Sequence, residues 1–162
     1  MFAVGDKIVY PTYGAGVIVD LVERDYNGSM EVYYDLRIPV GNLKLLINAR
    51  NAETLGLRRI YDKDEMCRII EDVSLQPISM PENWNVRCKN NMDKIKSGRL
   101  TEVTIVFRNL LFREKQRGLS SMEKKMMTTA KQIIVSEIIL SHEVEKCKAE
   151  DLLTGMLSEV AR

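Results

Sequence analysis

The sequence is poor in the residues that most enzymes and metalloproteins use for chemistry. Its 162 residues contain one histidine, three cysteines and one tryptophan. The cysteines, Cys67, Cys88 and Cys147, lie far apart in no CxxC or Cys/His spacing, so neither a disulfide framework nor a zinc site is predicted. We also find no glycine-rich phosphate loop and no catalytic triad. The sequence therefore predicts neither an enzyme nor a cofactor.

Long hydrophobic runs are also missing. No apolar stretch approaches the length needed to cross a bilayer, and the N-terminal residues lack the basic and apolar regions of a signal peptide. We therefore expect a cytoplasmic protein without a membrane partner. Hydrophobic residues nevertheless make up 45% of the chain, which is enough for one large domain or two small ones with real cores.

The net charge of +1 conceals an uneven distribution along the chain. Residues 1–83 carry a net charge of −4 and residues 132–162 a net charge of −3. Residues 84–131 carry +8, from 12 Lys and Arg against 4 Asp and Glu. A basic block inside an otherwise acidic protein favours a local polyanion-binding surface. The alternative is a lysine-rich helical surface that is merely solvated.

Residues 1–56 are predicted to form a small β domain. Short runs rich in β-branched and aromatic residues are separated by turn sequences, and Asn27-Gly28 between two such runs is a strong hairpin signal. Four or five strands in so few residues predict a small Tudor-like or SH3-like β-barrel, because closure removes exposed edges. With no candidate catalytic group in it, an interaction module is the better interpretation.

Residues 57–162 are predicted to form a compact bundle of about five α-helices, so the fold class is α+β. Apolar residues recur every three or four positions from Asp62 onward. Ser120 and Glu123 form a capping-box pattern that starts the fourth helix, and a fifth helix is expected over about Ala149–Val160. The short connections favour antiparallel neighbours.

The second of these helices, within Pro81–Gly98, carries the only tryptophan, Trp84, in its first turn. Asn83 is suited to cap its start and Gly98 to end it. An aromatic ring beside several cations is typical of proteins that press a side chain against nucleic-acid bases while holding phosphates. Because Trp84 also begins an apolar stripe with Cys88, the alternative is that Trp84 is a core residue.

Four motifs in order make the sequence similar to the CarD/CdnL family of bacterial transcription regulators. They are VGDKIVYPxxG at residues 4–14, NAExxGxR at 51–58, NWxxRxKxN at 83–91 and RGLSxxEK at 117–124. The resemblance runs nearly end to end. It implies that residues 1–56 resemble the RNA-polymerase-interacting domain shared with transcription-repair coupling factor, which binds the polymerase β subunit. It also implies that residues 57–162 resemble a domain that contacts promoter DNA at the upstream edge of the transcription bubble, without reading a specific sequence, and stabilises the open complex.

The resemblance also implies the site residues. On the DNA side these are the wedge Trp84, then Arg87 and Lys89, and in addition the basic pair Lys124 and Lys125 at a helix start. On the polymerase side, Arg24 matches a family cation, whereas Leu46 stands where some members place arginine, so nearby Lys44 and Arg50 join the set.

A non-DNA-binding adaptor that acts through the Tudor-like domain is the alternative function, and it requires Trp84 to be buried. A monomer is expected, and a dimer formed by a swapped β-hairpin is the alternative oligomeric state.

Overall fold

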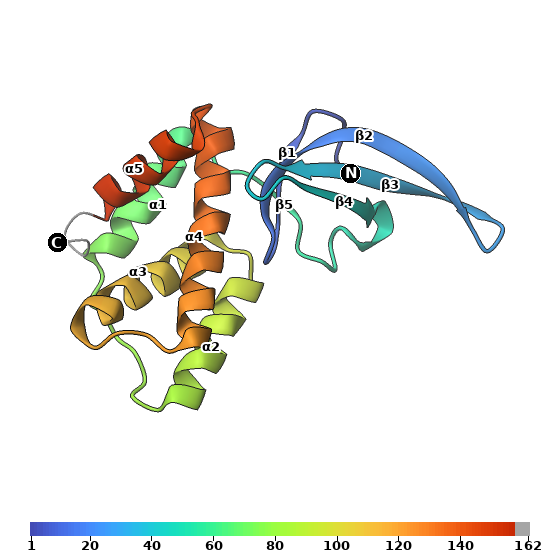
Figure 1. The fold of residues 1–162 in the computed structure, drawn as a ribbon. Helices are drawn as coiled ribbons and strands as arrows, with labels where there is room; N and C mark the ends of the chain where they lie inside the picture. The colour runs from blue at the N-terminus through green and yellow to red at the C-terminus, as the bar shows by residue number, and fades with distance from the viewer. Residues whose placement is uncertain (158–162) are drawn as a thin grey trace.

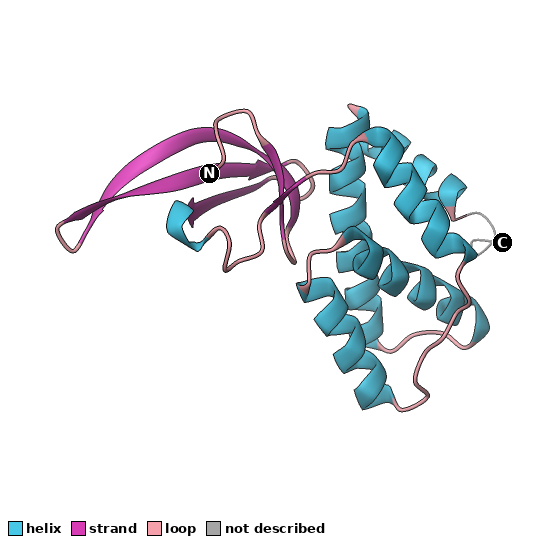
Figure 2. Cartoon of the chain, turned by 180° about the vertical axis from the view of Figure 1, so that it is seen from behind, coloured by secondary structure: helices cyan, strands magenta, loops and turns pink. Residues whose placement is uncertain are grey.

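The computed structural model of the protein describes residues 1–157. Strands come first and helices second, and the two groups lie side by side (Figure 1). The fold is therefore α+β, as the sequence predicts. Seen from behind, the helices gather at one side of the molecule and the two longest strands project away from them (Figure 2).

The N-terminal part is one antiparallel sheet with the strand order β4-β3-β2-β1-β5. The strands are β1 (Lys7–Tyr10), β2 (Gly14–Tyr26), β3 (Ser29–Ile38), β4 (Leu43–Asn48) and β5 (Arg58–Arg59), with a short 3-10 helix, η1 (Ala49–Asn51), after β4. The predicted hairpin is confirmed: Asn27 and Gly28 both have positive φ and join β2 to β3. Because β5 pairs with β1, the sheet continues past residue 56, the predicted domain boundary.

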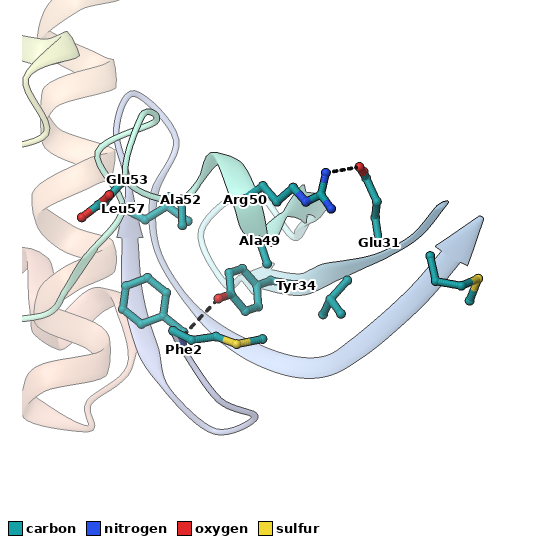
Figure 3. Close-up of a pocket in the computed structure, with 11 residues that line it drawn as sticks. Phe2, Glu31, Tyr34, Ala49, Arg50, Ala52, Glu53 and Leu57 are labelled. Carbon is teal, nitrogen blue, oxygen red and sulfur yellow. Dashed lines mark hydrogen bonds and ion pairs between the residues drawn. The ribbon is translucent and has the colours of Figure 1, made fainter. Parts of the chain in front are cut away.

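The prediction of a closed barrel is wrong. Strands β4 and β5 are the two edges of the sheet and do not pair with each other in the described residues. The strands differ too much in length to close: β2 has 13 residues and β5 has two. A hollow of about 620 Å³ lies beside the small core (Figure 3). Phe2 lines it, packing edge-on against Tyr34 with ring centroids 5.9 Å apart.

The helical part follows the predicted pattern closely. Its helices are α1 (Lys63–Leu75), α2 (Trp84–Lys96), α3 (Leu100–Gln116), α4 (Ser121–His142) and α5 (Lys146–Met156). Helix α4 is the longest and contacts each of the other four, so its apolar side, including Ile134 and Ile138, forms the centre of the larger core. Helix α5 begins one turn earlier than predicted, and Val160, its predicted end, lies outside the described residues.

The sheet is joined to the helices through α4. The Ala15 backbone N–H donates to Ser136 Oγ at 2.8 Å, and Gly14 has a φ of +114°, with the position of an added Cβ only 2.7 Å from that same oxygen. Only glycine allows this close approach. Beside it, Arg58 donates to both carboxylate oxygens of the fully buried Glu137, at 2.8 and 3.0 Å. We call these contacts the α4 joint.

Candidate functional site

The first turn of α2 presents Trp84 at the surface. The helix begins at Trp84 because Asn83 caps it, with its side chain accepting from the Val86 N–H at 3.1 Å. Trp84 is 44% exposed, so the interpretation of Trp84 as a core residue is wrong. The buried face of α2 is formed instead by Arg87, Asn91 and Ile95. The adaptor alternative thereby loses the buried tryptophan that it requires.

Trp84 lies against the start of another helix. Its indole Nε1 donates to Ser120 Oγ at 3.2 Å, and Ser120 is the N-cap of α4. The capping box predicted from Ser120 and Glu123 is confirmed. The N-termini of α2 and α4 therefore meet at the indole ring, and each contributes a partial positive charge that favours an anion such as phosphate.

The cations of the predicted DNA set do not all lie together. Lys124 and Lys125 are exposed in the first turn of α4, and Lys124 follows Ser120 by one helical turn. Lys89 is also exposed, but five positions separate it from Trp84, which places it about 140° around the α2 axis. There it pairs with Asp93 at 3.8 Å. The arrangement thus groups Trp84 with Lys124 and Lys125, and places Lys89 on another side of α2.

Arg87 lies in the interior and not on the surface where a phosphate would bind. Only 2% of it is exposed, and its Nε donates to Glu123 Oε2 at 3.0 Å. Its Nη1 donates to the carbonyls of Pro81 and Glu82, at 3.2 and 2.9 Å, which fixes the chain just before α2. The structure therefore places Arg87 where it supports Trp84 and leaves no open side for DNA.

Glu123 is the centre of this buried network. Besides Arg87, it is approached by Arg113 Nε at 3.5 Å and receives a hydrogen bond from Ser120 Oγ at 3.0 Å. Burial by itself would raise the pKa of Glu123, but the hydrogen bonds from Arg87 and Ser120 and the charge of Arg87 outweigh burial and hold this pKa below its usual value. Glu123 is therefore ionised at neutral pH.

The predicted polymerase contacts share one face of the sheet. Arg24 stands opposite Glu31 across β2 and β3, and Leu46 stands opposite Asp35 across β3 and β4. Side chains alternate along a strand, so Arg24, Lys44 and Leu46 point to the same side, away from the core residues Leu36 and Ile47. Leu46 is 41% exposed.

Two of the predicted polymerase-side cations form ion pairs with acidic residues of the sheet. Arg50 pairs with Glu31 at 3.2 Å (Figure 3), and Lys44 lies 4.0 Å from Asp35. A hollow of about 710 Å³ on this face is lined by both Leu46 and Arg50, together with Tyr26 and Tyr33. The face therefore combines exposed apolar and aromatic side chains with paired charges, a mixture that suits a protein-binding surface.

Comparison with known proteins gives two family matches. The CarD-like/TRCF RID domain matches residues 2–61, and the CarD C-terminal domain matches residues 68–154. The chain belongs to the CarD family. A Bacillus subtilis (strain 168) protein named "Putative transcription factor YdeB" is 31% identical over 138 residues, which cover 85% of this chain and 90% of that protein.

The two CarD family regions divide the predicted site residues cleanly. The four polymerase-side residues lie in the region of the RID domain, and the five DNA-side residues lie in the region of the C-terminal domain. The α4 joint connects the two regions, since Arg58 belongs to the first and Glu137 to the second. In the described residues, no helix is long and apolar enough to cross a membrane, and no three metal-binding side chains cluster.

From the sequence, Ser120 and Glu123 are placed in a helix cap and in the RGLSxxEK motif but not among the site residues, and Arg113 is not placed in the site. One signal was available: Glu123 is one of only four acidic residues within the basic block 84–131. An isolated carboxylate in such a segment points to a buried partner for an arginine. Which arginine pairs with it depends on how α2, α3 and α4 pack, and no local pattern shows that.

Proposed function

We propose that this protein is a non-enzymatic, cytoplasmic transcription regulator that binds bacterial RNA polymerase and stabilises the open promoter complex. The sheet face of Arg24, Lys44, Leu46 and Arg50 contacts the polymerase β subunit. Trp84 contacts promoter DNA at the upstream edge of the transcription bubble without reading a sequence, and Lys124 and Lys125 contact its phosphates. The protein acts as a monomer. Membership of the CarD family supports this role, as does the similarity to a relative named as a transcription factor.

One observation carries the DNA part of the proposal. The only tryptophan of the chain is exposed at the point where two helix N-termini meet, and the first turns of the second helix carry a pair of exposed lysines. A single exposed indole is not a binding site by itself, but this one lies at the positive ends of two helices, and α4 adds the exposed Lys124 and Lys125. This combination suits an anionic partner that offers a flat apolar face, and an opened base pair next to duplex phosphates has both properties.

The size of the effect follows from base stacking. One stacked base contributes about 1–3 kcal/mol, which corresponds to a shift of roughly 5- to 150-fold in the balance between closed and open promoter. The shift arises only if Trp84 contacts the open state and not the closed one, because equal affinity for both states changes nothing. An unpaired base exists only in the open state, so the proposed contact meets this condition.

The first test replaces Trp84 with alanine. We expect wild-type protein to lengthen the lifetime of the open complex of its own RNA polymerase on a responsive promoter, and Trp84→Ala to lose most of that gain, at most 150-fold. The lifetime is measured by competitor challenge. Leu75→Ala is the matched control, because Leu75 is also a large exposed apolar side chain (76% exposed) but lies at the end of α1. Equal lifetimes with wild type and Trp84→Ala would exclude the wedge.

The second test concerns the polymerase face. We expect Leu46→Asp to weaken binding to the isolated β subunit by about tenfold or more, roughly 1.4 kcal/mol, since it replaces an exposed apolar side chain of the face with a charge. Met30→Asp is the control: Met30 is 61% exposed and points to the opposite side of the same sheet. Binding is measured by surface plasmon resonance. Equal losses with the two variants would show that this face is not the contact.

A further inference from the structure

The indole ring of Trp84 is held in place although almost half of it is exposed. Its hydrogen bond runs from Nε1 to Ser120 Oγ, over 3.2 Å and between two different helices. An exposed ring in a first helical turn would otherwise change rotamers on the nanosecond scale. The bond to Ser120 fixes the direction of the ring before any DNA is present.

Ser120 is itself fixed in orientation. Its hydroxyl donates to Glu123 Oε1 at 3.0 Å and accepts from the Glu123 backbone N–H at 3.3 Å, besides accepting from Trp84. A serine hydroxyl has one donor and two acceptor sites, so all three sites are used. The hydroxyl therefore has no freedom to turn away from the indole.

Glu123 connects Ser120 back to α2 through Arg87. It is 2% exposed and accepts from Arg87, whose remaining donors hold the carbonyls of Pro81 and Glu82 immediately before Trp84. Helices α2 and α4 are thus connected twice, once through Trp84 and Ser120 and once through Arg87 and Glu123. A ring held by two such connections has its position set by the packing of two helices and not by one side-chain torsion.

We propose that Ser120 and Glu123 are positioning residues for the wedge: they order the indole of Trp84 before it meets DNA, so that binding to the opened base pair loses less side-chain entropy. This inference rests on the proposed function. Ordering one side chain beforehand corresponds to roughly a 2- to 10-fold gain in affinity for the bound state. Ser120 touches no base in this arrangement, and its effect passes entirely through Trp84.

The experiment uses Trp84 as its own probe, since it is the only tryptophan of the chain. Ser120→Gly removes the hydroxyl but keeps a residue that is tolerated at an N-cap, and Ser120→Thr restores a hydroxyl. Ser121→Ala is the matched control, because Ser121 is the exposed neighbour outside the network. Each full-length variant is measured without DNA by time-resolved fluorescence anisotropy, and with polymerase and promoter by open-complex lifetime. Thermal melting followed by circular dichroism verifies folding.

We expect Ser120→Gly to increase fast motion of the indole and to shorten the open-complex lifetime by roughly 2- to 10-fold, with Ser120→Thr and Ser121→Ala close to wild type. Unchanged anisotropy in Ser120→Gly would overturn the inference, as would faster indole motion with an unchanged lifetime. If Trp84→Ala itself leaves the lifetime unchanged, the proposed function fails too. If Ser120→Gly leaves the anisotropy or the lifetime unchanged while Trp84→Ala still shortens the lifetime, only the inference about Ser120 and Glu123 fails.

Discussion

Glu137→Ala is expected to lower the free energy of unfolding by roughly 3–5 kcal/mol, because it leaves the guanidinium of Arg58 without its buried partner. Glu137 is fully buried and receives two hydrogen bonds from Arg58 and a third from the Tyr61 backbone N–H, at 3.0 Å. Arg58 also donates to the Gly98 carbonyl at 3.0 Å. The pair thus joins β5, Tyr61 just after it, the chain just after α2, and α4.

Urea unfolding of the full chain measures this change. Glu143→Ala is the control at the other extreme of exposure: Glu143 follows α4 and pairs with Lys7 at 3.5 Å, but its side chain is 81% exposed. Exposed pairs contribute about 0–1 kcal/mol, so we expect a change below 1 kcal/mol. Similar losses in both variants would contradict the assignment of Glu137 as the central residue of the α4 joint.

Loss of the α4 joint is also expected to have a functional consequence. If the sheet face holds polymerase and the first turn of α2 reaches DNA, the distance between the two contacts is set by the α4 joint. If Glu137→Ala loosens the joint, the two parts move relative to each other, and forming the DNA contact after the polymerase contact then costs additional rigid-body entropy. Binding to the isolated β subunit should then stay at the wild-type level while the open-complex lifetime falls.

Glu123→Ala is expected to cause a loss of similar size, roughly 3–5 kcal/mol, since Arg87 would remain 2% exposed without a carboxylate. The fluorescence of Trp84 should change in addition to the stability, because Glu123→Ala also removes the acceptor of the Ser120 hydroxyl. The double variant Arg87→Met/Glu123→Leu is the informative comparison. Apolar replacement of a buried pair is often neutral or stabilising, so we expect stability to return while the order of Trp84 does not.

The pH dependence of Glu123→Gln checks the charge of the buried carboxylate. The pKa of Glu123 is lower in the folded protein than in the unfolded chain, so its contribution to stability is complete above the unfolded pKa and is lost as pH falls through the folded pKa. The stability difference between wild type and Glu123→Gln should therefore be constant near neutral pH and shrink in acid. A difference that grows on acidification would contradict an ionised Glu123.

Local features were predictable from the sequence because their causes lie within a few residues. The Asn27-Gly28 hairpin, the Asn83 cap of α2 and the Ser120 capping box all appear where the pattern places them. The apolar period of three to four indicated the helical half for the same reason. Four motifs in order indicated the CarD family, which the comparisons confirm.

The failures share a different cause. Whether the sheet closes depends on the pairing of β4 with β5, which are neighbours only after the chain has folded, and on a β5 that is too short to compete. Arg87 was expected to contact DNA from the surface because it matches a cation of the family motif. Its burial depends on Glu123, which lies 36 residues further along the chain and on another helix.

By itself, the sequence determined the family, the order of strands before helices and the helix caps. Each of these follows from residues close together in the chain. Only the tertiary structure decided that the sheet stays open, that Arg87 faces inward and that Ser120, held by Glu123, accepts the hydrogen bond of the Trp84 indole. These depend on contacts between α2, α3 and α4 or between sheet edges, and such contacts form only when several elements bury their apolar sides at once.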